Sequence, residues 1–308
     1  MSQAAGTSNQ LIEQASRIIA GKSEQIKLIW VSLLCNGHVL LEDLPGVGKT
    51  TLAQTLATLL GLSYQRVQFT ADLLPSDVIG AQIYDREQQS FYFHKGPVFT
   101  QLLLADELNR ATPKAQSALL EAMEERQVSV DGDSKPLPSP FFVIATQNPQ
   151  SQSGTYPLPE SQLDRFFVRI SLGYPDESVE KELLKGSIGR HKLQELLPII
   201  TSEQWPLLQK EVIQVSTSDA VLNYIMRLVK RTRDGEICAL GLSPRASQSL
   251  AMAAKAYALI SNRDYVIPDD VQAVFPAVAG HRLKACKAQN SELLVQRVLD
   301  SVAVIEGA

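Results

Sequence analysis

A glycine-rich turn followed by lysine and threonine is the first feature of this sequence that could bind a ligand. It occupies residues 43–50 and reads Asp-Leu-Pro-Gly-Val-Gly-Lys-Thr. Glycines let the backbone N–H groups of such a loop converge on phosphate oxygens, and the dipole of the following helix favours the same anion. Lys49 would reach the β- and γ-phosphates of a nucleotide, and the Thr50 hydroxyl would coordinate Mg²⁺. The predicted nucleotide contacts are Pro45, Gly46, Val47, Gly48, Lys49, Thr50 and Thr51.

The first position of this run departs from the usual pattern, which opens with glycine. Here the position holds Asp43. Because this position shapes the entry to the loop rather than the part that surrounds the phosphates, we expect binding to survive. A glycine-rich turn that only caps a helix is the alternative. The Gly-Lys-Thr sequence, between an expected strand and an expected helix, argues against that alternative.

A second group of polar residues follows apolar segments. Residues 102–105 are Leu-Leu-Leu-Ala, and Asp106 and Glu107 come directly after them. Asp106 could hold Mg²⁺ through its water shell, and Glu107 could orient or deprotonate the water that attacks the terminal phosphate. Asn148 follows another apolar segment and could hydrogen-bond that phosphate or the water. Since the carboxyl ends of parallel strands share one edge of a sheet, we expect these side chains to meet Lys49 there.

Two arginines lie where they could contact an anion. Arg165 comes just before the last expected strand. Arg245 lies in the first turn of an expected helix, with Ser243 as N-cap and Pro244 at the first helical position. A cation there opposes the helix dipole, and an anion such as phosphate would explain it. Surface salt bridges are the alternative for both arginines, and the sequence does not decide between the two interpretations.

Short apolar segments alternate with helical ones through the first half of the chain. This alternation indicates βαβ units and predicts an α/β fold, with a parallel sheet between helices. The N-terminus is expected to be frayed. The expected strands are 38–42, 64–69, 102–105, 141–146 and 166–170, and the expected helices are 11–20, 24–35 and 51–60.

Two stretches interrupt this alternation. The polar tip at 85–89 predicts a hairpin inside an insert at about 70–98, and turn residues predict a second hairpin at about 127–140. Farther along, helical patterns replace the strand pattern. We therefore predict an α/β core over residues 1–190 and a smaller all-α lid domain over 191–308. The expected lid helices are 219–232, 244–260 and 268–278.

Taken together, these features resemble the AAA+ ATPases, and within them the MoxR family. The resemblance covers residues 21–283 and implies a P-loop domain followed by a helical lid. Six signatures in order, at family-like spacing, make coincidence an inadequate explanation. They are the run at 43–50, LADELNR at 104–110, QSALLEAMEER at 116–126, ATQNP at 145–149, QLDRF at 162–166 and LSPRA at 242–246.

The resemblance implies binding and hydrolysis of ATP with Mg²⁺. Lys49 and Thr50 are similar to the Walker A pair, which binds phosphate and metal. Asp106 and Glu107 resemble the Walker B pair, in which the first acid holds the metal and the second activates water. Residues near Gly21 are the region where this family binds adenine.

The resemblance also assigns the remaining polar residues. Asn148 is similar to sensor 1 and Arg245 to sensor 2. Arg165 resembles the arginine finger that reaches the ATP of a neighbouring subunit, which can accelerate hydrolysis by about 10³ to 10⁵. A ring, usually a hexamer, is therefore implied. Arg110 either senses the neighbour or forms a salt bridge.

Family members act as chaperone-like remodelling ATPases, often with partners that carry a von Willebrand factor A domain, so a protein client and such a partner are expected. The insert and the second hairpin also place the chain near magnesium chelatase ATPase subunits and helicases of the MCM type. Metal insertion and a nucleic-acid-stimulated motor are therefore alternatives. The second hairpin carries Asp131, Asp133 and Lys135, which is net acidic and argues against nucleic acid. A scaffold with negligible turnover is a third interpretation, which Glu107 argues against.

Composition excludes several classes of protein. The 308 residues are 44% hydrophobic and 20% charged, as in a globular protein with a substantial core. A net charge of −4 gives no general attraction to nucleic acid or anionic membranes. No apolar run reaches the length of a membrane span, and the N-terminus is unlike a signal peptide, so a cytoplasmic location is expected. The three cysteines and four histidines are scattered, which favours buried thiols and structural histidines over a metal site.

Overall fold

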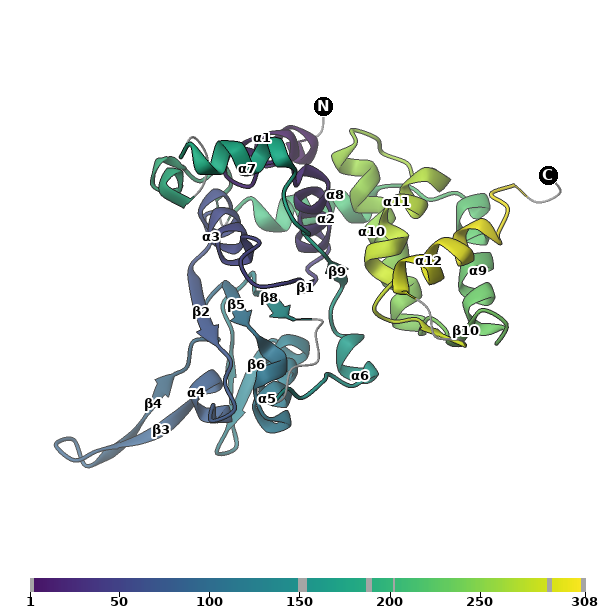
Figure 1. The fold of residues 1–308 in the computed structure, drawn as a ribbon. Helices are drawn as coiled ribbons and strands as arrows, with labels where there is room; N and C mark the ends of the chain where they lie inside the picture. Colours follow the sequence, from purple (N-terminus) through teal and green to yellow (C-terminus); the bar gives the residue numbers. More distant parts are fainter. Residues whose placement is uncertain (1–2, 149–153, 187–189, 202, 287–289, 306–308) are drawn as a thin grey trace.

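Five parallel strands form the central sheet, as the alternating apolar segments predicted (Figure 1). The computed structural model describes residues 3–148, 154–186, 190–201, 203–286 and 290–305. Strand β5 is buried at every position, because helices cover both faces of the sheet. Across the sheet the strands are β2 (Tyr64–Gln68), β5 (Leu102–Asp106), β8 (Phe142–Gln147), β1 (Val39–Glu42) and β9 (Val168–Ile170).

Successive residues of the strands enter two separate apolar layers, as the period of a strand requires. In β5, Leu102 and Leu104 join the first layer, and Leu103 and Ala105 join the second. The α/β fold predicted for this part is therefore confirmed. The first layer contains helices α1 (Gln3–Ile18), α2 (Ser23–Leu34) and α3 (Lys49–Leu59), and the second contains α4 (Pro75–Ile79) and α5 (Pro113–Glu125).

The N-terminal segment is helical rather than frayed, so the prediction of a helix that begins at residue 11 was wrong. Helix α1 begins at Gln3. Ala4 and Ser8 are fully buried, and the Trp30 indole donates a hydrogen bond of 2.7 Å from Nε1 to Ser8 Oγ. Small side chains gave no apolar pattern in the sequence, yet they allow this turn to pack closely against α2.

The insert forms a hairpin that projects from the body of the molecule, as predicted (Figure 1). Its strands are β3 (Gly80–Asp85) and β4 (Ser90–Lys95). Gly80 has φ 98°, and a Cβ there would lie 2.4 Å from the His94 carbonyl oxygen, so the hairpin base requires glycine. The second predicted hairpin consists of β6 (Gln127–Val130) and β7 (Asp133–Pro136).

The region after the sheet is helical, as predicted, but it also contains a two-stranded antiparallel sheet of β10 and β11. Ser243 caps α10 by accepting a hydrogen bond from the Ala246 N–H, with Pro244 at the first helical position, which confirms that prediction. The boundary at residue 190 stays a prediction. The elements are α6 (Glu160–Leu163), α7 (Glu177–Leu184), α8 (Trp205–Gln214), α9 (Asp219–Arg233), β10 (Cys238–Leu240), α10 (Pro244–Ile260), α11 (Pro268–Ala279), β11 (Lys284–Ala285) and α12 (Ser291–Asp300), with 3₁₀ turns η1 (Leu108–Arg110) and η2 (Arg190–Glu195).

Helix α8 joins this helical region to the sheet. Trp205 is almost fully buried, and its ring centroid lies 5.6 Å from that of Trp30 and 5.0 Å from that of Phe142. Aromatic pairs at these separations add to the stabilisation that burial already provides. Both tryptophans are therefore packing residues.

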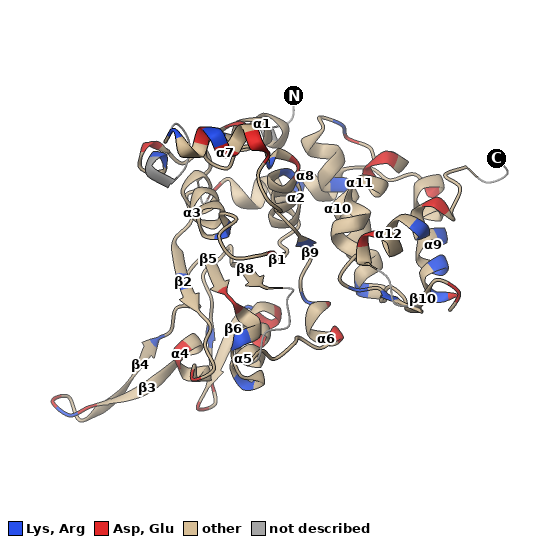
Figure 2. Cartoon of the chain, in the orientation of Figure 1, with Lys and Arg blue, Asp and Glu red and all other residues tan. Residues whose placement is uncertain are grey.

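Charged residues of both signs are interspersed along the chain, as the colours of Figure 2 show. The strands of the projecting hairpin carry few of them apart from its tip. Among the described residues, no helix is long and apolar enough to cross a membrane.

His38 links three elements at the amino end of β1. Its Nδ1 accepts a hydrogen bond of 3.0 Å from the Val143 N–H, and its Nε2 donates to the Met123 carbonyl at 3.1 Å. Burial, and then the charge of Arg126, lowers the pKa of His38 to about 4. The folded chain therefore holds a neutral imidazole, as a structural histidine requires.

We expect this histidine to make folding pH-dependent. Above pH 6.5 its imidazole is neutral in both the folded and the unfolded chain, so its contribution to stability is fully present there. As the pH falls from 6.5 towards 4 the unfolded chain binds a proton that the folded chain does not, and stability falls by up to about 3 kcal/mol. When the free energy of unfolding is measured by urea denaturation between pH 7 and pH 4, it should fall less for His38→Gln than for the wild type. Identical pH profiles would contradict the assignment.

Candidate functional site

The turn between β1 and α3 has the backbone shape of a phosphate-binding loop. Gly46 has φ 87° and Gly48 has φ 92°, a region that L-residues with side chains avoid. A Cβ added at either glycine would meet no atom within 4 Å. The backbone conformation therefore requires glycine here, and the loop faces open space at both positions.

Lys49 is the first residue of α3, and its side chain folds back over this loop. Its Nζ donates to the carbonyl oxygens of Asp43 at 2.7 Å and Leu44 at 3.1 Å. Partial burial lowers the pKa of Lys49, and the carboxylates of Asp43, Asp106 and Glu107 oppose that shift. The lysine thus lies within the electrostatic reach of the acids that end β5.

Asp43, which replaces the usual glycine, has a structural function. Its buried carboxylate accepts three hydrogen bonds from the segment after β9. The donors are the Ser171 hydroxyl at 2.8 Å, the Leu172 N–H at 2.5 Å and the Gly173 N–H at 3.0 Å. The side chain therefore fastens the entry of the loop to the end of the neighbouring strand.

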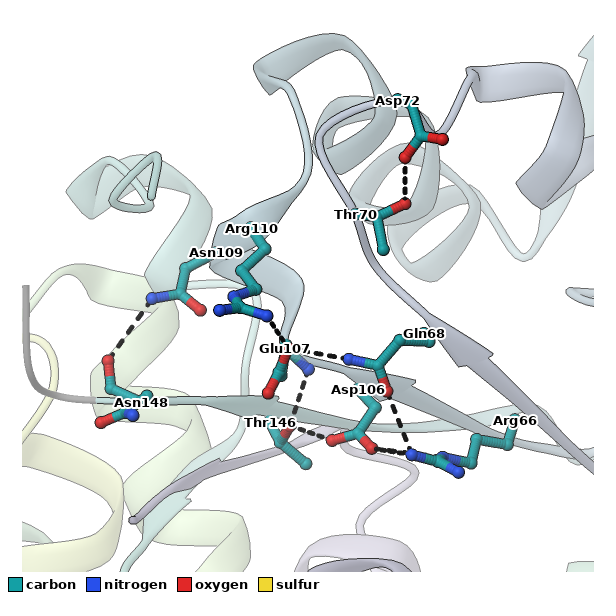
Figure 3. Close-up of polar contacts among 10 residues, drawn as sticks. All are labelled: Arg66, Gln68, Thr70, Asp72, Asp106, Glu107, Asn109, Arg110, Thr146 and Asn148. Atoms are coloured by element: carbon teal, nitrogen blue, oxygen red, sulfur yellow. Dashed lines mark hydrogen bonds and ion pairs between the residues drawn. The ribbon is translucent and has the colours of Figure 1, made fainter. Parts of the chain in front are cut away.

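Asp106 ends β5 and is held from both sides (Figure 3). Its Oδ1 accepts a hydrogen bond of 2.6 Å from the Thr146 hydroxyl on β8. Its Oδ2 accepts from Arg66 on β2, with Nη2 at 2.7 Å and Nε at 3.2 Å. The carboxylate is only slightly exposed, so neighbouring strands on both sides fix its position.

Glu107 has φ 55°, a left-handed conformation that is costly for any residue except glycine. Its N–H donates to Thr146 Oγ1 at 2.8 Å. Its carboxylate oxygen Oε2 accepts from Gln68 Nε2 at 2.8 Å and from Arg110 Nη1 at 2.9 Å (Figure 3). Arg110 therefore forms a salt bridge, one of the two roles considered for it, with the acid proposed to activate water.

Asn148 follows β8, the strand between β1 and β5. Because the three strands are parallel, Asn148 lies at the same sheet edge as Lys49 and Asp106. Its carbonyl accepts a hydrogen bond of 3.4 Å from Asn109 Nδ2. Pro149, the last residue of that sequence signature, lies outside the described residues.

Arg165 and Arg245 lie elsewhere, at the amino edge of the sheet. Arg165 precedes β9, and the Phe167 N–H donates to the His38 carbonyl just before β1. One carboxylate on α5 binds both arginines: Glu124 lies 3.0 Å from Arg165 Nε and 2.5 Å from Arg245 Nη2. These two arginines therefore do not join Lys49 and the acids within one chain.

The backbone segments that carry the two arginines are also tied together. Asp164 accepts a hydrogen bond of 3.0 Å from the Ser243 hydroxyl and one of 2.7 Å from Arg282 Nε. A cavity of about 210 Å³ adjoins this junction, with Arg165, Arg245 and Arg282 in its lining. The hydrogen bond from Arg245, and with it the charge of Arg165, lowers the pKa of Glu124.

Comparison with known proteins decides the family. Residues 38–168 match the profile of the ATPase family associated with various cellular activities (AAA), and residues 230–302 match the AAA lid domain. The chain is 41% identical over 313 aligned residues to Chaperone MoxR1 of Mycobacterium tuberculosis, covering 97% of this chain and 82% of that protein. The chain belongs to the MoxR family of AAA+ ATPases.

Two further proteins are similar to this MoxR-family chain over nearly their whole length. An uncharacterized protein of Bacillus subtilis, YeaC, is 45% identical over 298 residues, which are 95% of this chain and 93% of that one. A crystal structure of a candidate ATPase from Cytophaga hutchinsonii has a TM-score of 0.89 and 36% identity, covering 98% of this chain and 96% of that chain. The fold class predicted from the sequence, an AAA+ core followed by a lid, is thus confirmed.

Several residues of this MoxR-type site were not identified from the sequence. Arg66, Gln68 and Thr146 contact the two acids, and Glu124 binds the two arginines. In the sequence, Arg66 and Gln68 look like the solvent-facing residues of an ordinary strand. The order of strands in space decides that β2 lies beside β5, and no local pattern encodes that order.

Restoring the usual glycine at position 43 should weaken the fold. Asp43→Gly removes the two oxygens that accept these three hydrogen bonds and leaves the buried Leu172 N–H without its partner, a loss of about 1–3 kcal/mol. The free energy of unfolding from urea denaturation checks this value. Asp72→Gly, at an exposed position before α4, is the matched control and should change stability much less. A variant as stable as the wild type would contradict the structural function of Asp43.

Proposed function

We propose that this chain binds ATP with Mg²⁺ at the carboxyl edge of its sheet and hydrolyses it. One observation supports this most strongly: β1 and β5 both pair in parallel with β8, so that Lys49 after β1 and the acids Asp106 and Glu107 at the end of β5 lie at one edge of the sheet. Lysine neutralises phosphate charge, and the two acids supply a metal-binding group and a base, which are the components that phosphoryl transfer needs.

The residues present fit a magnesium ion. Mg²⁺ prefers hard oxygen ligands and keeps several of its waters. The Thr50 hydroxyl in the first turn of α3 and the carboxylate of Asp106 offer such oxygens at one sheet edge. When bound, the ion would neutralise charge that develops on the β- and γ-phosphates.

The chain's own side chains account for the remaining requirements. Gln68 and Arg110 hold the Glu107 carboxylate, so that it can orient a water molecule or accept its proton. Asn148, which follows the strand between the lysine and the acids, would hydrogen-bond the terminal phosphate or that water. The N–H groups of the loop would surround the phosphates.

The arginines at the opposite edge support action between subunits. Arg165 and Arg245 share Glu124 and lie at the amino ends of the strands, whereas the nucleotide loop follows a carboxyl end. We infer that both arginines act on ATP bound to a neighbouring copy. Hydrolysis would then require a ring, for which we propose a hexamer, and Arg245 would connect the lid to the neighbour's nucleotide.

The substrate of the assembled ring is proposed to be a protein. One relative bears the name chaperone. The projecting hairpin exposes apolar side chains, notably Tyr84, Phe91 and Tyr92, on strands with few charges (Figure 2). Such residues suit contacts with a protein client better than contacts with a phosphate backbone. A partner with a von Willebrand factor A domain remains a proposal from the family resemblance, and a cytoplasmic location remains a proposal from the sequence.

Replacement of the proposed base tests hydrolysis. Glu107→Gln should lower ATPase turnover by about 10²-fold or more while ATP binding persists, because a general base typically contributes that much. Phosphate release and the binding of a fluorescent nucleotide measure the two effects. Glu87→Gln, at the exposed tip of the hairpin, is the matched control and should keep full turnover. Equal rates for the Glu107→Gln variant and the wild type would refute the enzymatic proposal.

Mixing two inactive variants tests action between subunits. Lys49→Ala should abolish nucleotide binding, and Arg245→Ala should abolish hydrolysis. If Arg245 acts on the neighbour's ATP, an equimolar mixture should regain part of the activity, because Arg245→Ala subunits keep ATP and receive the arginine from Lys49→Ala subunits. If Arg245 acts within its own chain, the mixture should stay inactive. Size-exclusion chromatography with light scattering verifies that the variants assemble together.

A further inference from the structure

An arginine contacts the carboxylate that is proposed to hold Mg²⁺. Arg66 donates to Asp106 Oδ2 through both Nη2 and Nε, while Asp106 Oδ1 is occupied by the Thr146 hydroxyl (Figure 3). Protein donors therefore engage both oxygens of this carboxylate. The sequence offered no indication of this contact, and the proposed function gives Arg66 no role.

The strands explain why Arg66 reaches this carboxylate. Strand β2 pairs in parallel with β5, with Gln68 opposite Asp106 and Arg66 opposite Leu104. Residues two apart on a strand share a face, so Arg66 and Gln68 both lie beside the acids. Arg66 Nη2 also donates to Gln68 Oε1 at 3.0 Å. The two contacts hold the guanidinium in position over Oδ2.

The guanidinium is free to leave this position. The Arg66 side chain is 47% exposed, whereas that of Asp106 is only 11% exposed. Rotation of Arg66 towards solvent keeps its charge hydrated, so the movement costs little more than the loss of the ion pair itself. Asp106, in contrast, cannot move to find another partner.

We propose that Arg66 is a built-in competitor of Mg²⁺ for Asp106, an inference that rests on the proposed function. Two N–H groups of Arg66 already occupy the lone pairs of Oδ2, so neither the metal ion nor a water of its shell can use this oxygen at the same time, and the positive charges repel each other. Binding of magnesium or its water shell at Oδ2 therefore requires Arg66 to turn away. Arg66 lowers the apparent affinity for the metal by the fraction of time it spends on the carboxylate.

Competition makes a specific prediction about the link between metal and nucleotide. Without Mg²⁺, Arg66 stays on the Asp106 carboxylate. With Mg²⁺, it must be displaced. Replacement of Arg66 by an uncharged residue should therefore increase the gain in nucleotide affinity that Mg²⁺ provides. An ion pair of this exposure corresponds to a change of up to about fivefold.

The experiment measures this gain with the full chain and needs no turnover. Dissociation constants for a fluorescent ADP analogue are determined in EDTA and in saturating Mg²⁺, and their ratio is compared between proteins. Arg66→Met, which keeps an unbranched stem without charge, should raise the ratio by up to about fivefold. Arg66→Lys keeps the charge and should give a ratio near that of the wild type. Circular dichroism melting checks that each variant is folded.

Arg231→Met is the matched control. Arg231 also forms ion pairs, with Asp234 and Glu236, but it lies on lid helix α9. The substitution makes the same change in charge and should leave the ratio unaltered. An unchanged or lower ratio in folded Arg66→Met, with nucleotide binding intact, would overturn the competition. Failure of the wild type to bind the ADP analogue under either condition would instead refute the proposed nucleotide function.

Discussion

The common direction of the five strands is the constraint on which the remaining structure depends. Because every strand runs the same way, the loop after β1, the acids after β5 and the asparagine after β8 all lie at one edge. For the same reason Arg165, which precedes β9, lies at the other edge. A single antiparallel strand among β1, β5 or β8 would separate the lysine from its acids or from Asn148. The hydrolysis between copies that we propose would thus be a consequence of sheet polarity.

Cross-strand hydrogen bonds turn this shared edge into a defined geometry. Thr146 supports both acids, since its hydroxyl donates to Asp106 and accepts from the Glu107 N–H. On the other side, Arg66 and Gln68 each bind one acid. Residues from three strands therefore fix two adjacent carboxylates. Without such donors, the free-energy cost of removing these carboxylates from water would not be compensated by hydrogen bonds.

The lid is joined to the sheet before β9 and within it. Before the strand, the ion pair of Asp164 with Arg282 links core and lid. Within the strand, Arg169 pairs with Glu42, next to the nucleotide loop, and donates to the lid residues Gly280 and Ser291. Movement of the lid would therefore act on the segment that begins the loop. This arrangement suits a protein in which nucleotide state and domain angle change together.

The sequence by itself determined what local pattern encodes: the apolar strands and helices, both hairpins, the cap at Ser243 and the glycines of the loop. These features depend on residues close together in the chain, so periodicity and turn chemistry reveal them. Other features depend on strand order and on where the lid lies. They are the packing of the first helix, the contact of Arg66 with Asp106, and the binding of both Arg165 and Arg245 by Glu124. Only the tertiary structure decided them, because side chains that are separated by tens of residues meet through the packing of the whole chain.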